Sequence, residues 1–447
     1  MNAGFLRQAA APILDLPGAD GVEMVLTASE TALTRYALSE IIQNTVRSDV
    51  RAYVRVVTGG QHAIAATNQL DATSLRSTAV RALEAARASP PDPDFPGLPT
   101  PEKVGRAEGV FRWDDDTSRA TPEQRAAAVR TLLRTANSSN AAGIFETSAH
   151  SFGVINSRGI DCWDRFTRCV TTCLVDEDDG TGWGEASSHA MTDVDIEGAA
   201  RRAADKARAG KDPVATEPGD YEVVLEPSAT AMLIEYLSYM GFGAKQVLDG
   251  ESFLASLAGE KVAAKAITIA DDVYDPLSVG IGFDFEGVPK RTVTVIDKGH
   301  AVAPVSDLRT APKLDLAPSG HFSGSVEFGP HASNVILRSG TQSREELISG
   351  VKDGVLVTRF HYVNLLDRPA TLLTGMTRDG TFRIRNGEVA EPVNNFRFSQ
   401  SVLDALSSTV GVGSDVAAFA PDFGSFGSNA APSLRIEGFR FASTTSH

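Results

Sequence analysis

Four histidines in the C-terminal half are the residues best suited by type to bind a metal: His300, His321, His331 and His361. They are scattered over 60 residues, and no two of them stand at i, i+2 or i, i+4, the spacings that would form a chelating pair on one strand or helix face. A folded sheet could still bring His321 and His331 together with a carboxylate such as Glu327. A hydrolase with a relocated site there is one hypothesis, and surface or hydrogen-bonded histidines are the simpler interpretation.

A second group with metal-binding chemistry is the carboxyl cluster from Asp176 to Asp179, which is followed by Gly180. An EF-hand calcium loop needs glycine at position six and glutamate at position twelve. With Asp176 as position one, the glycine falls at position five and Ser187 occupies position twelve. The spacing therefore predicts a solvated hairpin turn and no calcium site.

The sequence carries no pattern typical of a nucleophile or of a phosphate-binding loop. The serine- and glycine-rich segments 319–325 and 424–428 lack the G-x-S-x-G spacing of a nucleophile elbow. Gly241-Phe242-Gly243 follows an expected helix, which is the wrong order for a dinucleotide site between a strand and a helix. No catalytic residue and no cofactor-binding residue is predicted in this chain.

The three cysteines, Cys162, Cys169 and Cys173, lie in one segment that has strand character. On a strand, Cys169 and Cys173 would lie about 13 Å apart, well beyond the ~7 Å between Cα atoms that a disulfide allows. Buried, reduced thiols in the cytoplasm are the expectation.

Size and charge exclude several classes of protein. A chain of 447 residues is long enough for two or three domains. The net charge of −15, from 42 basic and 57 acidic residues, argues against a nucleic-acid-binding face. No apolar run approaches the ~18 residues of a membrane span, and the N-terminal segment lacks the pattern of an export signal. We expect a cytoplasmic protein with no nucleic-acid or membrane partner.

The N-terminal half mixes strands with helices. Val50 to Ala66 reads as two strands joined at Gly59-Gly60, because paired glycines supply the positive φ angles of a tight hairpin. Asp71 to Ala88 has the apolar periodicity of a helix, and Pro90 to Pro101 is expected to be an extended connector. A second helix is expected to start at Thr121, where Pro122 and Gln124 complete a capping box.

The rest of that half is strand-rich from Gly143 to Val175, with a turn at 156–159, and ends in an alanine-rich helix from Asp193 to Ala209. The polar segment Lys211 to Gly219 is the expected boundary between domains. The prediction is an N-terminal α/β domain at 1–215, with its proline-rich connector near 90–101, and a β-rich C-terminal domain at 216–447.

The C-terminal half contains four dipeptides that favour hairpin turns: Lys298-Gly299, Asp353-Gly354, Asp379-Gly380 and Asn386-Gly387. They separate short apolar runs, which indicates a twisted antiparallel sheet or a partly closed barrel. The predicted class is α+β.

One helix is expected in that half directly after Leu225. Its apolar side chains recur at helical spacing, as is typical of core packing, at Ala229, Met232, Leu233, Tyr236, Leu237 and Met240. Only Glu235 interrupts this stripe. The chain has no histidine between His189 and His300, so this helix carries none.

Several blocks, by their order and spacing, resemble the TldD/PmbA (TldD/TldE) family of metallopeptidase-related proteins over Val46 to Ala442. They are VRVVTGGQHAIAATN, INSRGID, PGDYEVVLEPSATAMLIEYL, ESFLASLAGEKVAAKAITIADD, GFDFEGVPKRTVTVIDKG and APSLRIEGFRFAS. In the TldD branch this helix carries H-E-x-x-x-H, and a cysteine near the C-terminus completes a zinc site.

Carried over to this sequence, the first histidine falls on Glu235 or Ile234, and the second falls on Met240 or Tyr239. The last cysteine is Cys173, so the C-terminal thiolate has no counterpart either. Methionine and tyrosine are not credible substitutes as zinc ligands here. The sequence therefore resembles the TldE/PmbA branch, in which a subunit without a metal site pairs with a TldD-type subunit.

The resemblance implies an α/β N-terminal part and a C-terminal domain built on a curved, barrel-like antiparallel sheet. It also implies a non-catalytic subunit of a zinc-dependent peptidase, with zinc only in the TldD-type partner. Unfolded peptide would be held largely through backbone pairing to strands. The alternative is a stand-alone homodimer that binds peptides without cleaving them.

Overall fold

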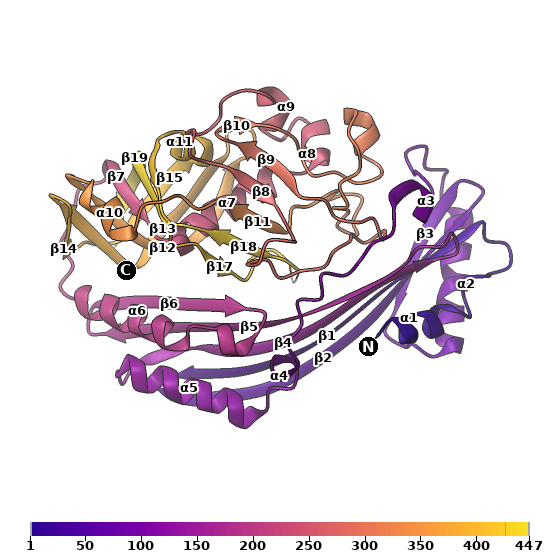
Figure 1. Cartoon of the computed structure of the whole chain (residues 1–447), viewed down its shortest axis with the longest axis horizontal. Coiled ribbons are helices and arrows are strands. Elements are labelled where there is room, and N and C mark those ends of the chain that lie inside the picture. Colours follow the sequence, from indigo (N-terminus) through magenta and orange to yellow (C-terminus); the bar gives the residue numbers. More distant parts are fainter. Residues whose placement is uncertain (1, 425, 446–447) are drawn as a thin grey trace.

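The computed structural model describes residues 2–424 and 426–445, and its longest feature is a curved six-stranded sheet from the first half of the chain (Figure 1). The strands are all antiparallel and follow the order β3-β2-β1-β4-β5-β6. Their bounds are β1 Gly21–Ala37, β2 Glu40–Thr58, β3 Gln61–Thr67, β4 Ala141–Asn156, β5 Asp161–Glu177 and β6 Gly180–Ser188. The predicted strands and the hairpin turns at 59–60 and 178–179 are confirmed.

Helices cover one face of this sheet, and the C-terminal half of the chain lies against the other (Figure 1). Strand alternation produces this division, because neighbouring side chains point to opposite faces. Met24 and Leu26 pack with α1 and α2, whereas Val25 packs with Phe283 of the C-terminal half. The helices of this half are α1 Ala3–Ala10, α2 Ala72–Ala88, α3 Pro101–Val104, α4 Asp115–Ser118, α5 Pro122–Ala136 and α6 Ile196–Ala209. The short α3 is the exception to this division, because its Val104 packs with the cluster of Val25 and Phe283.

Side chains cap several of the helix starts, and the capping box predicted at Thr121 is confirmed. The Asp71 side chain accepts the N–H of Ser74 at the start of α2. Thr121 and Gln124 form a complete capping box on α5. Helix α6 begins slightly later than expected, at Ile196, because Asp195 is the residue that caps it. Residues 90–100 connect these elements without helix or strand, as predicted.

Strand β6 and helix α6 approach each other closely because both carry small residues. A Cβ on Gly182 would lie 2.0 Å from the carbonyl oxygen of Ala203, and one on Gly184 would lie 1.9 Å from that of Ala199. Only glycine allows this distance. The contact fixes α6 on β6 and so sets where Arg202 and Lys206 emerge.

The C-terminal half forms two further sheets. One follows the order β10-β9-β8-β11-β18-β17, and the other contains seven strands in the order β12-β7-β19-β15-β13-β14, with β16 beside β19. Strand β12 pairs with both β7 and β13, so the second sheet curves into a partial ring, although it is not a barrel. The bounds are β7 Gly219–Leu225, β8 Ile269–Asp271, β9 Val293–Asp297, β10 His300–Ala301, β11 Asn334–Leu337, β12 Asp353–Asp367, β13 Leu372–Arg385, β14 Glu388–Pro392, β15 Phe396–Ser401, β16 Thr409–Val412, β17 Ala417–Phe419, β18 Ser428–Ala431 and β19 Leu434–Thr444.

Short helices connect these strands, and one long helix, α7, packs between the two sheets (Figure 1). Their bounds are α7 Pro227–Gly241, α8 Ala244–Leu248, α9 Leu254–Leu257, α10 Arg344–Ser349 and α11 Val402–Ser407. The predicted mixed class with a strongly curved C-terminal sheet is confirmed. Within the described residues, no helix is both long and apolar enough to cross a membrane.

The prediction of a hairpin turn is wrong for two of the four dipeptides. Lys298-Gly299 and Asn386-Gly387 do form turns, but Asp353-Gly354 opens β12 and Asp379-Gly380 lies inside β13. The φ angles of Asp379 and Gly380 are 55° and 121°, and the pairing register with β12 shifts beside them. The positive φ of this dipeptide therefore produces a bulge and no reversal of the chain. The β7–β12 and β11–β18 pairs are parallel, which the expected antiparallel sheet did not include.

Candidate functional site

Helix α7 follows β7 directly and is a core element, as its pattern predicted. Pro227 occupies its first turn, where the missing N–H costs nothing. Four of the predicted core residues are buried to 1% exposure or less, and Met232 and Tyr236 are partly buried at the rim of the same cluster. The four are Ala229, Leu233, Leu237 and Met240.

The four positions of α7 that correspond to the zinc ligands of the TldD branch divide into two pairs. Ile234 and Met240 are fully buried in the C-terminal core. Glu235 and Tyr239 instead meet the segment between β17 and β18, where Phe423 lies. The helix therefore directs one pair into packed hydrocarbon and the other against a loop.

Phe423 covers the outward side of α7. Its backbone N–H donates a 2.9 Å hydrogen bond to Oε1 of Glu235. Its ring stacks on Tyr239 with centroids 4.6 Å apart and meets Tyr236 edge-on at 5.0 Å. Burial raises the pKa of Glu235 to about 7, against the lowering effect of the Phe423 amide, and nearby Asp422 raises it further.

The residues at these positions do not fit a zinc ion. Ile234 has no donor atom, the thioether of Met240 is enclosed by the core, and the Tyr239 ring is stacked on Phe423. Glu235 is the only carboxylate among them, and one ligand cannot form a tetrahedral zinc site. Among residues 2–424 and 426–445, no three His, Cys, Asp or Glu side chains converge as a metal ion would require.

The structure brings two of the scattered histidines together, but not into a metal site. The backbone N–H of His331 donates to the carbonyl of His321 at 2.9 Å. Glu327, the proposed third member, is exposed, and His300 lies exposed on β10. Burial lowers the pKa of His331 to about 4 and also lowers that of His361.

His321 belongs to a buried polar chain instead. Its Nε2 lies 2.9 Å from Oδ1 of Asp271, and its Nδ1 lies 2.9 Å from Oγ of Ser319. All three side chains are nearly inaccessible, and Ser319 Oγ also bonds the backbone of Ser306. A Ser-His-Asp combination that no substrate can reach is structural, because a nucleophile needs an open approach.

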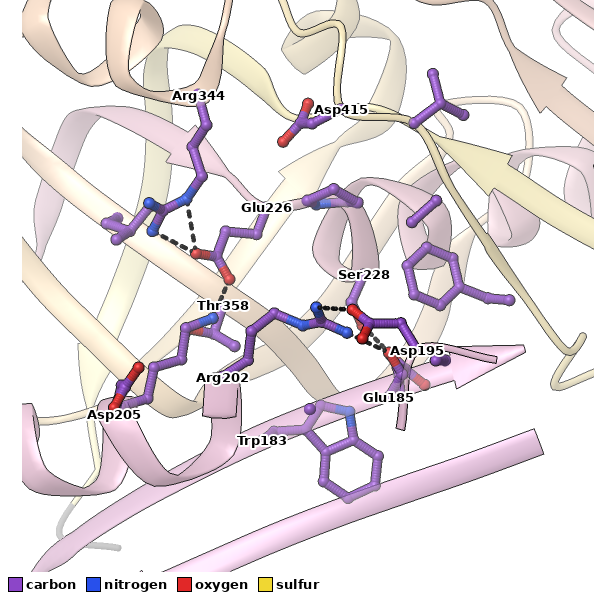
Figure 2. A pocket seen from close by; sticks show the side chains of 18 of the residues that line it. Trp183, Glu185, Asp195, Arg202, Asp205, Glu226, Ser228, Arg344, Thr358 and Asp415 are labelled. Carbon is purple, nitrogen blue, oxygen red and sulfur yellow. Dashed lines mark hydrogen bonds and ion pairs between the residues drawn. The ribbon is translucent and has the colours of Figure 1, made fainter. Parts of the chain in front are cut away.

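A cavity with a volume of about 760 Å³ lies between the N-terminal sheet and the C-terminal half. Strand β6 and helix α6 form one wall, and the start of α7, strands β12 and β13 and the segment 415–419 form the other. Figure 2 shows its polar side chains converging from both walls. A volume of this size is typical of a ligand-binding pocket.

The carboxylate of Glu226, immediately before α7, bonds cations from both walls. Lys206 of α6 donates to Oε2, and Arg344 of α10 donates to Oε1 through Nη2 at 2.6 Å and Nε at 3.1 Å (Figure 2). Burial would raise the pKa of Glu226, but the two cations outweigh it and the pKa is lowered. Burial lowers the pKa of Lys206, against the effect of Glu226.

A second polar group faces the same cavity. The Ser228 hydroxyl donates to Oε1 of Glu185 at 2.6 Å, and burial raises the pKa of Glu185 (Figure 2). Arg202 lies 3.4 Å from Asp195. Trp183 adds an aromatic surface, and the Arg359 guanidinium lies over its ring, 3.9 Å from the centroid. This arrangement can bind polar and apolar groups, but it pairs no nucleophile with a histidine base.

Sequence reasoning did not identify this cavity. Glu226 lies 20 residues from Lys206 and 118 from Arg344, so no local spacing connects them. The only signal was an acidic residue directly before the helix-starting Pro227, which is also typical of an ordinary helix start.

Comparison with known proteins identifies the family. The family model for the PmbA/TldA metallopeptidase C-terminal domain matches residues 218–443, and the model for the central domain of the same family matches residues 113–211. The chain belongs to the PmbA/TldD family. The resemblance inferred from the sequence blocks is therefore confirmed.

Curated relatives of this PmbA/TldD chain are described as metalloproteases. One from Methanothermobacter thermautotrophicus is 32% identical over 226 residues, which cover 49% of each protein. A metalloprotease PmbA homolog from Buchnera aphidicola is 25% identical over 136 residues, which are 30% of this chain and 28% of that protein. The chain thus matches about half the length of such relatives, or less.

Solved structures share the fold over the whole PmbA/TldD chain. TldE from Thermococcus kodakarensis superposes with a TM-score of 0.84 at 19% identity, covering 99% of this chain and 100% of that one. A Thermotoga maritima protein described as a modulator of a DNA gyrase gives 0.82 at 20% identity, covering 98% and 99%. At these identities the likeness is one of fold.

Proposed function

We propose that this chain is a non-catalytic subunit of a zinc-dependent peptidase and pairs with a TldD-type subunit that carries the H-E-x-x-x-H helix. The observation that supports this proposal is that the ligand positions of α7 make packing contacts. Ile234 and Met240 fill the core, while Glu235 and Tyr239 hold Phe423. A helix whose ligand positions have taken on packing roles supplies architecture to a peptidase and no metal.

The zinc, on this proposal, resides in the partner, and the complex works in the cytoplasm on unfolded peptides or small proteins. Three buried free cysteines on β5 are compatible with a reducing compartment. We also propose that the cavity lined by Trp183, Glu185 and Ser228 contacts peptide, because it combines a suitable volume with carboxylate, cationic and aromatic groups.

The test compares the purified chain alone, a TldD-type subunit alone and the two together. Elemental analysis should find no stoichiometric zinc in the isolated chain, and cleavage of an unfolded, carboxymethylated protein should require the partner. Stoichiometric zinc in this chain, or cleavage by this chain alone, would overturn the proposal. Failure to co-purify with the partner, combined with peptide binding, would favour the stand-alone homodimer.

Peptide contact at the cavity can be tested separately through Trp183. Titrating the same unfolded protein into the isolated chain should change the intrinsic fluorescence, and a Trp183→Phe variant should lose most of that change. Trp113 and Trp163, which do not line the cavity, provide the background signal. An equal change in the variant would place the peptide elsewhere.

A further inference from the structure

The cavity between β6, α6 and the start of α7 carries more negative than positive charge. Among its lining residues in the described part of the chain, six side chains are acidic and three are basic. Each basic side chain already bonds a carboxylate. Lys206 and Arg344 share Glu226, and Arg202 lies 3.4 Å from Asp195. An anionic ligand would therefore have to displace an existing ion pair.

Glu185, on β6, is a partly buried carboxylate of this cavity that has no cationic partner. Its Oε1 accepts the Ser228 hydroxyl at 2.6 Å. None of the ion pairs found among the described side chains includes Glu185, although several involve its neighbours in the cavity. A cationic ligand could bond this carboxylate without breaking an ion pair of the protein.

The surroundings of Glu185 compensate its negative charge poorly. Burial raises its pKa, Asp422 acts in the same direction, and Arg359 opposes them. The Arg359 guanidinium is bonded to Asp379 through Nε at 2.7 Å, so its positive charge is already shared. A cation at Glu185 would stabilise the ionised carboxylate, because opposite charges attract more strongly where bulk water is excluded.

A second polar group of the cavity lacks a partner. The Thr358 side chain on β12 is 3% exposed, and its Oγ1 has no hydrogen-bond partner among the residues that the structure describes. Figure 2 shows Thr358 among the side chains that line the cavity. A buried hydroxyl without a partner costs free energy, so a ligand with a peptide group gains by bonding it.

Much of the remaining lining is apolar. Leu356, Phe382, Val389 and Phe419 line the cavity together with the Trp183 indole. A lysine or arginine side chain has an apolar stem and a charged end, so it can pack its methylene groups on such a surface and direct its charge to a carboxylate. An α-ammonium group has no stem and would leave the apolar surface uncovered.

We propose that this cavity binds a lysine or arginine side chain of an unfolded peptide, with the cationic group at Glu185 and a backbone group of the peptide at Thr358. The inference rests on the peptide contact proposed above and names the peptides that the cavity favours, which carry basic residues. Glu185 determines this specificity, and Ser228 orients its carboxylate. The acidic lining also attracts such peptides before contact.

Matched fluorescent peptides test the preference. They share a flexible sequence of glycine and serine, are blocked at both ends, and differ in one central residue, which is lysine, arginine, norleucine or glutamate. Fluorescence anisotropy with the full chain should show the lysine and arginine peptides binding about 10- to 100-fold more tightly than the norleucine peptide, as expected for hydrogen bonds to a charged group. The glutamate peptide should bind most weakly.

Three variants locate the preference. Glu185→Gln keeps an oxygen for the Ser228 hydroxyl but carries no charge, so the lysine peptide should fall to the affinity of the norleucine peptide without a decrease in Tm. Glu197→Gln is the matched control, because it removes one charge from the exposed surface of α6 outside the cavity, and it should keep the preference. Thr358→Val should weaken the binding of all four peptides alike.

The possible failures are distinguishable. Equal affinity for the lysine and norleucine peptides would overturn the preference and leave the cavity as a peptide site without it. A lysine preference that survives in Glu185→Gln, or that Glu197→Gln reduces as much, would place the cation elsewhere and overturn the role of Glu185. No binding of any peptide, with no change in Trp183 fluorescence, would overturn the peptide contact together with the preference.

Discussion

The backbone N–H of Phe423 donates a 2.9 Å hydrogen bond to Oε1 of Glu235, which ties the segment between β17 and β18 to the middle of α7. This contact uses the outward face of α7. In TldD-type subunits, the corresponding helix carries the zinc-binding histidines. Because Tyr239 stacks on the same phenylalanine, two adjacent turns of α7 hold one loop. The loop contact gives the first two predictions.

Glu235 should make stability depend on pH. Burial raises its pKa from 4.5 to about 7, so the folded state binds this proton more tightly than the unfolded state. The stability that the protonated Glu235 carboxyl contributes is therefore fully present below pH 4.5. It is lost as the pH rises through about 7. At ~1.4 kcal/mol per pKa unit, the loss is on the order of 3 kcal/mol. Urea unfolding of wild type and Glu235→Gln between pH 4.5 and 8 measures it.

The comparison with Glu235→Gln isolates this group, because the buried carboxyls Asp284 and Glu286, whose pKa values are also raised by burial, are present in both proteins. Glutamine keeps an oxygen that can accept the Phe423 N–H. Parallel stability curves for the two proteins would contradict the prediction.

Phe423→Ala should loosen the loop without unfolding the protein. The ring is only half-buried, so losing its two aromatic contacts should cost about 1–2 kcal/mol. Amide hydrogen exchange should accelerate at residues 420–424, while the amides of α7 stay protected. The matched control is Phe419→Ala, which alters the neighbouring strand but not this stack. Uniformly faster exchange across α7 would indicate global destabilisation instead.

Glu226→Ala should be strongly destabilising, because it leaves Lys206 and Arg344 without their shared carboxylate. Removing one member of a buried ion pair costs about 3–5 kcal/mol. The control is Glu391→Ala, which breaks the exposed pair with Arg385 and should cost less than about 1 kcal/mol. Denaturant unfolding at neutral pH compares the two. Similar losses of unfolding free energy in the two variants would show that the ion pairs of Glu226 with Lys206 and Arg344 are screened by solvent and contribute little.

The buried polar chain of Asp271, His321 and Ser319, and His331 beside it, should contribute to folding stability and not to cleavage of peptides. His331→Ala should leave any peptidase activity of the complex unchanged, which would exclude a relocated site around His321 and Glu327. Asp271→Asn should destabilise the chain by about 2–3 kcal/mol, because Asp271 bonds His321 and also accepts the N–H groups of Ser333 and Asn334. Loss of cleavage in His331→Ala with unchanged Tm would instead support a site there.

Local chemistry was readable directly from the sequence. The capping box of α5, the glycine turn at 59–60 and the apolar stripe of α7 each act over a few neighbouring residues, so their outcomes follow from spacing alone. The absence of histidines from α7 was visible in the same way. The prediction failed where one local signal serves two structures. Asp379-Gly380 supplies positive φ for either a turn or a bulge, and the pairing with β12 selected the bulge.

Only the tertiary structure decided what depends on distant segments. It placed Glu226 between Lys206 and Arg344, brought Phe423 onto Glu235, and paired His321 with Asp271 across 50 residues of sequence. Such contacts arise from how sheets curve and pack. Local spacing carries no record of that geometry, whereas it does specify a helix cap, which needs only residues within one turn of each other.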